Sequence, residues 1–174
     1  MPKDFSNLSF SDPIEICLKP EWFKMGYYVY VVVIKSKGGM YFYVGMTGDR
    51  KHKIARSPFY RMSGHFMLGK STQNQIIKGL KNFQKKKITS DSLCKMEFTY
   101  YNYLIHSYKE NIKEKTHHKC RRDAEIIESY LIDKLKAEFG KSNVFNKYKS
   151  AKETGKYKLF SERIFVDLIK RIND

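Results

Sequence analysis

Every residue of the run 27–34 is aromatic or β-branched. Such residues favour an extended backbone, and an uninterrupted apolar run of this length is typical of a strand buried on both faces. Residues 35–39 then supply a short loop with two glycines, and residues 40–44 are β-prone again. Two strand-forming runs joined by a short glycine-containing loop predict a β-hairpin.

Further helices and one more strand are predicted along the rest of the chain. Ser57 and Pro58 are typical of the first positions of a helix, which we expect over residues 57–68. Apolar residues at helical spacing predict helices over 73–87, 121–139 and 161–172, and the Phe- and Tyr-rich segment 93–105 predicts a third strand. This order predicts an α/β fold, with a small, largely antiparallel three-stranded sheet flanked by helices.

The length of 174 residues, of which 41% are hydrophobic, favours one domain with a real core. We expect residues 1–25 to form an arm packed on the domain, residues 26–150 to form the domain itself, and residues 151–174 to add a helical extension. Cys17, Cys94 and Cys120 are far apart, which favours free, buried thiols in a reducing cytoplasm. No apolar run reaches membrane-spanning length, so no membrane partner is expected.

The net charge of +16 is concentrated in one region. Residues 50–90 contain eleven Lys or Arg residues and no Asp or Glu, so this region should attract a polyanion. Charge alone also allows a merely solvated surface, but interleaved aromatic and polar residues favour a nucleic acid. An anionic membrane is the weaker alternative, because no basic helix in the chain has a clean apolar face opposite. The basic residues that we expect to contact it are Arg50, Lys51, Lys53, Arg56, Lys70, Lys81, Lys85, Lys86 and Lys87.

The hairpin also carries candidate chemical groups. Residues two apart in a strand share a face, so Tyr28 and Tyr30 point the same way, and Tyr43 on the second strand can lie across from them. Tyrosine is common in strands and usually only packs. A functional interpretation therefore needs further residues elsewhere in the chain.

Three further features supply such residues. Arg61 and His65 are four apart on a predicted helix and so share a face, which joins a permanent cation for phosphate to a group that exchanges protons near neutrality. Glu128 adjoins an apolar helical stripe, where a carboxylate is costly unless it is paired or binds a cation. Asn146 follows that helix. His117 and His118 are adjacent on a helix and are expected at the surface.

Taken in order, these residues resemble the GIY-YIG nucleases, whose hairpin bears Gly-Ile-Tyr on one strand and Tyr-Ile-Gly on the next. The second half is nearly intact as Tyr43-Val44-Gly45, and in the first half Tyr28 stands in place of the glycine. The family also has an Arg on the next helix, a metal-binding Glu on a later one and a closing Asn, matched here by Arg61, Glu128 and Asn146.

The resemblance implies a metal-dependent DNA endonuclease whose catalytic domain spans residues 26–150. It implies catalytic roles for Tyr30, Tyr43, Arg61, His65 and Glu128, with Tyr28, Gly45 and Asn146 in support. Glu128 would hold one Mg²⁺ or Mn²⁺ per active site, and Arg61 the scissile phosphate. Tyr30 would deprotonate the attacking water, with Tyr43 and His65 orienting the water or relaying the proton. The sequence leaves open whether Tyr28 or Tyr30 is the functional tyrosine of the first strand.

The chain has no length to spare for a separate DNA-binding domain, which favours a stand-alone type II restriction enzyme acting on double-stranded DNA. Two strands require two active sites, so a homodimer is expected. A non-specific or single-strand-preferring nuclease is the nearest alternative. A non-catalytic nucleic-acid-binding protein on the same fold is the alternative from another functional class.

Overall fold

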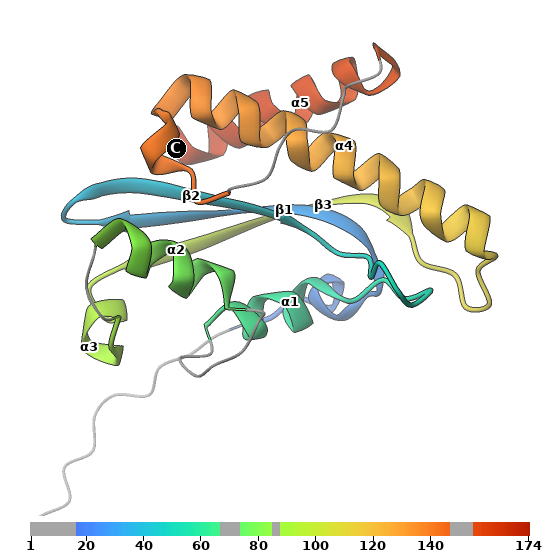
Figure 1. Ribbon diagram of the computed structural model, residues 1–174, viewed down its shortest axis with the longest axis horizontal. Coiled ribbons are helices and arrows are strands. Elements are labelled where there is room, and N and C mark those ends of the chain that lie inside the picture. Colours follow the sequence, from blue (N-terminus) through green and yellow to red (C-terminus); the bar gives the residue numbers. More distant parts are fainter. Residues whose placement is uncertain (1–16, 67–73, 85–87, 147–154) are drawn as a thin grey trace, which may run out of the picture.

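The structure is a computed structural model, and it describes residues 17–66, 74–84, 88–146 and 155–174. Three antiparallel strands form one sheet in the order β2-β1-β3, namely β1 (Gly26–Ser36), β2 (Gly39–Met46) and β3 (Glu97–Ser107). Figure 1 shows helices on both faces of this sheet. The α/β fold with a small antiparallel sheet is therefore confirmed.

One face of the sheet is covered by α4 (Glu114–Phe139) and α5 (Gly155–Asn173), and the short 3-10 helix η2 (Lys141–Asn143) follows α4. The other face is covered by η1 (Pro20–Phe23), α1 (Pro58–His65), α2 (Gln75–Gln84) and α3 (Ser90–Leu93). The sheet is thus the middle layer of three, which explains why the run at 27–34 is apolar on both sides.

Alternation along β1 divides the core in two. Val29 and Val31 face α4 and α5, where Ile127, Leu131 and Leu168 join the same buried cluster. The intervening residues of β1 face α2, and Tyr30, Val32 and Ile34 pack there with Ile76 and Leu80. Because Leu168 lies in this core, α5 is an integral part of the domain's packing.

The hairpin turns at Lys37 and Gly38, with Ser36 paired to Gly39. Gly39 has a φ of +122°, a backbone conformation that side chains rarely adopt, so glycine fits this end of the turn. The strands are longer than the predicted segments 27–34 and 40–44, but the predicted hairpin is confirmed.

Several predicted boundaries were wrong. Helix α1 ends at His65 instead of residue 68, and β3 begins at Glu97 instead of 93 because α3 intervenes, capped by Thr89. Helix α4 begins at Glu114 instead of 121. The added turns contain His117, which is buried: its Nδ1 lies 2.7 Å from the Tyr27 hydroxyl. The predicted surface position is therefore wrong for His117 and confirmed for His118, which is exposed.

The N-terminal segment is described from residue 17. Trp22 in η1 packs against Tyr100, and Phe23 against Phe59, so this part of the expected arm lies on the domain. All three cysteines are free, but Cys17 and Cys94 are exposed, so their expected burial was wrong. Within the described ranges, no helix combines the length and apolar character that crossing a bilayer requires.

Candidate active-site groove

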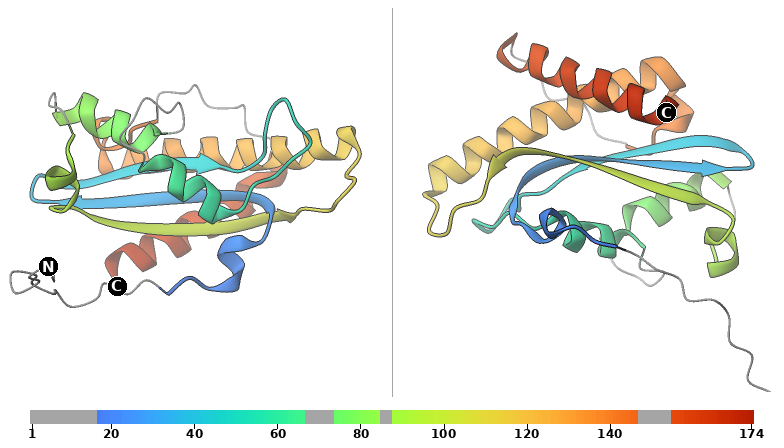
Figure 2. Two further views of the ribbon diagram at one scale, coloured as in Figure 1. Left: turned by 90° about the horizontal axis from the view of Figure 1, so that it is seen from below. Right: turned by 180° about the vertical axis from the view of Figure 1, so that it is seen from behind.

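A groove of about 1180 Å³ runs beside the β2 edge of the sheet, between α2 and α4. Figure 2 shows these two helices on opposite faces of the sheet. Tyr43 from β2, Arg61 from α1 and Glu128 from α4 all line the groove. Residues separated by more than 80 positions in the sequence therefore meet in one place.

A hydrogen-bonded cluster lies directly behind this groove. The Tyr30 hydroxyl is 2.7 Å from His65 Nε2, and Arg61 Nη2 donates to the same hydroxyl at 3.4 Å. Because a guanidinium only donates, the Tyr30 oxygen accepts a hydrogen bond from Arg61. The Tyr30 hydroxyl can then donate its own proton in a hydrogen bond to His65 Nε2. The spacing of four residues on α1, which begins at the Ser57 cap, brings Arg61 and His65 onto one tyrosine.

The two tyrosines of the hairpin differ in access to the groove. Tyr30 is only 1% exposed and does not line it, whereas the Tyr43 side chain lines it at 9% exposure. Burial raises the pKa of Tyr30, although the positive charge of Arg61 acts in the opposite direction. Burial raises the pKa of Tyr43 well above 10, and the neighbouring Tyr30 and Glu128 add to this effect. Both are therefore neutral phenols at pH 7, and Tyr43 is the one that a substrate would meet.

Gly45 explains how Tyr30 fits. The register pairs Tyr30 with Gly45, and a methyl group at Gly45 would overlap the Tyr30 ring. Glycine is thus needed here for close approach of an aromatic ring. Tyr28 lies elsewhere, in a separate pocket of about 610 Å³ beside Trp22 and Tyr100. The structure therefore brings Tyr30, not Tyr28, to Arg61 and His65.

Asn146 fixes the β2 edge. Its Oδ1 accepts from the Val44 N–H at 2.8 Å, and its Nδ2 donates to the Val44 carbonyl at 2.7 Å. The neighbouring Phe145 N–H donates to the Phe42 carbonyl at 2.9 Å. These bonds hold residues 144–146 against the strand that carries Tyr43, so Asn146 acts by positioning that strand.

Glu128 lies half-buried on the α4 wall of the groove. Burial, and then the neighbouring Glu125, raise the pKa of its carboxyl to about 8, although Arg61 and Arg121 act in the opposite direction. Glu125 itself pairs with Arg121 at 3.1 Å and with Arg50 at 3.7 Å. A carboxylate that is poorly stabilised by the protein alone is suited to a bound cation.

Mg²⁺ commonly binds through one or two carboxylates, with waters and substrate phosphates completing its shell. Glu128 and Glu125, one helical turn apart, fit that mode. Across the residues that the structure describes, no group of three or more His, Cys, Asp or Glu side chains is gathered as a metal cage.

The predicted basic contacts separate into three groups. Arg50, Lys51 and Arg56 line the groove. Lys53 and Lys81 are exposed but do not line it. Lys70, Lys85, Lys86 and Lys87 lie outside the described residues.

Sequence reasoning missed three cations that line the groove, namely Lys78, Arg121 and Arg122. The signal for Arg121 was available: positions 121, 125 and 128 recur at helical spacing, so Arg121 shares a face with Glu128. Because the helix was predicted to begin at residue 121, Arg121 fell in its first turn. Residues of a first turn are often solvent-exposed, so Arg121 was not expected to line a groove.

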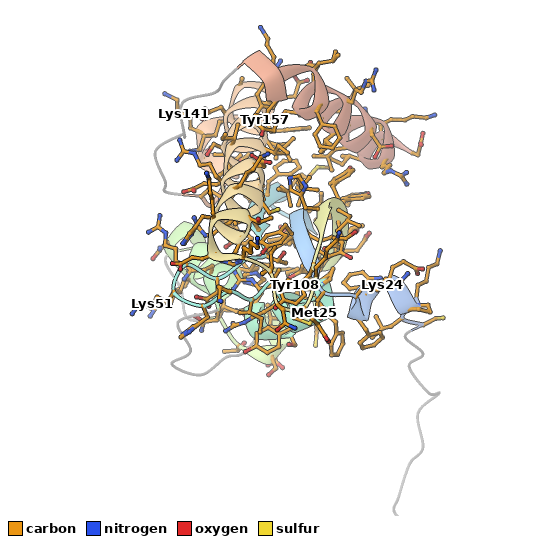
Figure 3. All side chains as sticks on the ribbon, turned by 90° about the vertical axis from the view of Figure 1, so that its right-hand side faces the viewer. Lys24, Met25, Lys51, Tyr108, Lys141 and Tyr157 are labelled. Carbon is orange, nitrogen blue, oxygen red and sulfur yellow. The ribbon has the colours of Figure 1, made fainter. Side chains whose placement is uncertain are left out.

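The loop at residues 47–57 is held in place from several sides. The Asp49 carboxylate accepts from the Lys51 and His52 backbone N–H groups, and His117 Nε2 lies 3.0 Å from the Asp49 carbonyl oxygen. The Tyr108 hydroxyl donates to the Lys53 carbonyl at 3.0 Å. Figure 3 shows Lys51 on the opposite side of the molecule from Lys24. The loop thus presents its basic side chains from a fixed backbone.

In comparisons with known proteins, no family model, no curated protein and no solved structure matches this chain. Its function is therefore inferred from the residues of the groove.

Proposed function

We propose that this protein is a metal-dependent DNA endonuclease of the GIY-YIG kind, acting on double-stranded DNA as a type II restriction enzyme. The observation that carries the proposal is the convergence of Tyr43, Arg61 and Glu128 on one cationic groove, with Tyr30 and His65 hydrogen-bonded behind it. Each group corresponds to a requirement of phosphodiester hydrolysis: a proton acceptor, a cation for the phosphate and a carboxylate for a metal ion.

The proton path follows the order of the side chains. Tyr43 faces the groove and would accept the proton of the attacking water, while its own proton passes to Tyr30 and from there to His65 Nε2. The two rings lie side by side with their centroids 6.3 Å apart, and Tyr30 contributes to raising the pKa of Tyr43. The resemblance implies that Tyr30 is the base. Because Tyr30 is buried, we assign the role of base to Tyr43 instead.

Arg61 would hold the scissile phosphate. Its guanidinium lines the groove and also donates to Tyr30, so a phosphate bound to it lies next to the proton path. Arg50, Lys51 and Arg122 would bind flanking phosphates, because they line the same groove.

Glu128 would hold the divalent metal ion, with Glu125 close enough to orient bound water. When bound, Mg²⁺ or Mn²⁺ supplies charge neutralisation on the phosphate and the leaving oxygen. Ionised Glu128 is then stabilised, and the positive charges of Arg61 and Arg121 orient the substrate from either side. A homodimer would supply the second active site that the second strand of a duplex requires.

The test is incubation of purified protein with mixed-sequence duplex DNA and Mg²⁺, followed by electrophoresis, with a chelator control. The proposal expects discrete fragments that disappear on chelation. A smear would indicate a non-specific nuclease, and intact duplex with single-stranded DNA degraded would indicate single-strand preference. DNA that is bound but intact under all conditions would contradict the proposal and favour a non-catalytic binding protein.

A further inference from the structure

The two walls of the groove differ in chemistry. The wall formed by α2 presents Gln75, Lys78 and Asn82. The opposite wall, formed by α4 and the loop at 47–57, carries the carboxylates Asp49, Glu125 and Glu128 and a larger set of cations: Arg50, Lys51, Arg56, Arg121 and Arg122. Cations suit phosphates, whereas Asn and Gln amides pair with adenine edges and Lys with guanine edges. The α2 wall therefore has the composition of a base-reading surface beside a phosphate-binding one.

The three polar residues of α2 that line the groove form a single row. Gln75, Lys78 and Asn82 follow at spacings of three and four and are all exposed, while Ile76 and Leu80 are buried against the sheet. The seven residue-to-residue steps from Gln75 to Asn82 span about 10 Å at 1.5 Å per residue. That length covers about three base pairs, since base pairs are stacked at about 3.4 Å.

Helix α2 is also held at a fixed distance from the candidate catalytic groups. Glycine within a helix costs about 1 kcal/mol relative to alanine, and here it serves close packing: a Cβ at Gly79 would lie 2.5 Å from the Phe145 ring. The Phe145 N–H donates a hydrogen bond to the Phe42 carbonyl, and the side chain of the next residue, Asn146, accepts one from the Val44 N–H. The same segment thus locates both α2 and the strand that carries Tyr43.

We propose that α2 is the sequence-reading element of this protein, with Gln75, Lys78 and Asn82 contacting base edges in the major groove of duplex DNA. This inference rests on the proposed function and adds to it the residues that set specificity. It predicts a preference for adenine near Gln75 and Asn82 and for guanine near Lys78, within about three base pairs at a constant distance from the cut.

The test measures binding and does not require cleavage. Full-length Glu128→Gln protein, without a further change or with Gln75→Ala or Asn82→Ala added, is incubated with a randomised duplex DNA library. The DNA bound by each variant is then sequenced. Each substitution should relax the preference at one base pair by about tenfold. It should leave the salt dependence of binding unchanged, because amides contact no phosphate. Lys81→Ala is the matched control: Lys81 is exposed on the same helix outside the groove, and its removal should leave the preference unchanged.

The outcomes separate this inference from the proposed function. Unchanged preferences in both amide variants, or binding without any preference, would overturn the role of α2, even if the parent protein cuts DNA. Relaxed preferences in a protein that never cuts would support α2 as the reader and overturn the nuclease proposal alone. Thermal denaturation of each variant checks that a lost preference is not lost folding, and absence of DNA binding in folded protein overturns both.

Discussion

The substitution Glu128→Gln should stabilise the metal-free protein at alkaline pH. The pKa of Glu128 is raised from about 4.5 to about 8, so the folded state holds this proton more tightly than the unfolded chain. A group with a raised folded pKa contributes its stabilisation fully below the unfolded value and loses it as the pH rises through the folded value. The parent protein should therefore lose stability between about pH 4.5 and pH 8, and the neutral amide should not.

The size of the effect follows from the shift. The difference of 3.5 pKa units between 4.5 and 8 corresponds to at most about 5 kcal/mol. Water in the groove reaches this half-buried side chain and reduces that limit, so about 1–3 kcal/mol is expected at pH 9. For a chain of this length, each kcal/mol raises the Tm by about 2–4 °C.

The assay is thermal denaturation in chelator at pH 5 and pH 9. The variant and the parent should unfold at similar temperatures at pH 5, and the variant should unfold several degrees higher at pH 9. Glu138→Gln is the control, because Glu138 is an exposed glutamate on the same helix and its removal changes the net charge equally. Adding Mg²⁺ at pH 9 should raise the Tm of the parent and not that of the variant. A Glu128→Gln protein that is no more stable than the parent at pH 9 would refute this reasoning.

Three further predictions concern the hairpin and the groove. Tyr43→Phe and Tyr30→Phe should each slow cleavage by about 10²–10⁴-fold, with Tyr28→Phe close to the parent; a large loss in Tyr28→Phe alone would show that the hairpin assignment is wrong. Gly45→Ala should destabilise the protein by about 1–3 kcal/mol in thermal or urea unfolding, but cost little in a Tyr30→Ala background, and equal costs in both would contradict the ring contact. Neutralising Lys51 and Arg122 should lower the slope of log affinity against log salt by about two. The same change at Lys158 and Lys170 of α5 should leave the slope unchanged. If both double variants lower the slope equally, DNA does not bind specifically in the groove.

Much of this arrangement was predictable from local patterns. The apolar run at 27–34 and the glycines that follow determine the hairpin, because strand-forming residues and a short turn act over neighbouring positions. The helical spacing of Arg61 and His65 likewise predicted a shared face, and the structure places both on Tyr30.

Other features depend on contacts between distant parts of the chain, which local patterns do not carry. The first turns of helix α4, which begins at Glu114, contain His117, and His117 is hydrogen-bonded to Tyr27, 90 positions away in the sequence. Tyr30 is covered by side chains of α1, since its hydroxyl is bonded to His65 and Arg61 more than 30 positions away, and Tyr43 is left to line the groove. The role of Asn146 depends on its pairing with Val44, 102 positions away, which no turn preference of Asn would indicate.

Metal-dependent cleavage in this groove is tested by comparing the parent protein with Glu128→Gln on one duplex substrate in Mg²⁺, with cleavage and binding measured together. The variant should bind the duplex about as tightly as the parent, because no phosphate-binding cation is removed, and its cleavage should be abolished. Cleavage by the variant at the parental rate would contradict the assignment of this groove as a metal-dependent active site.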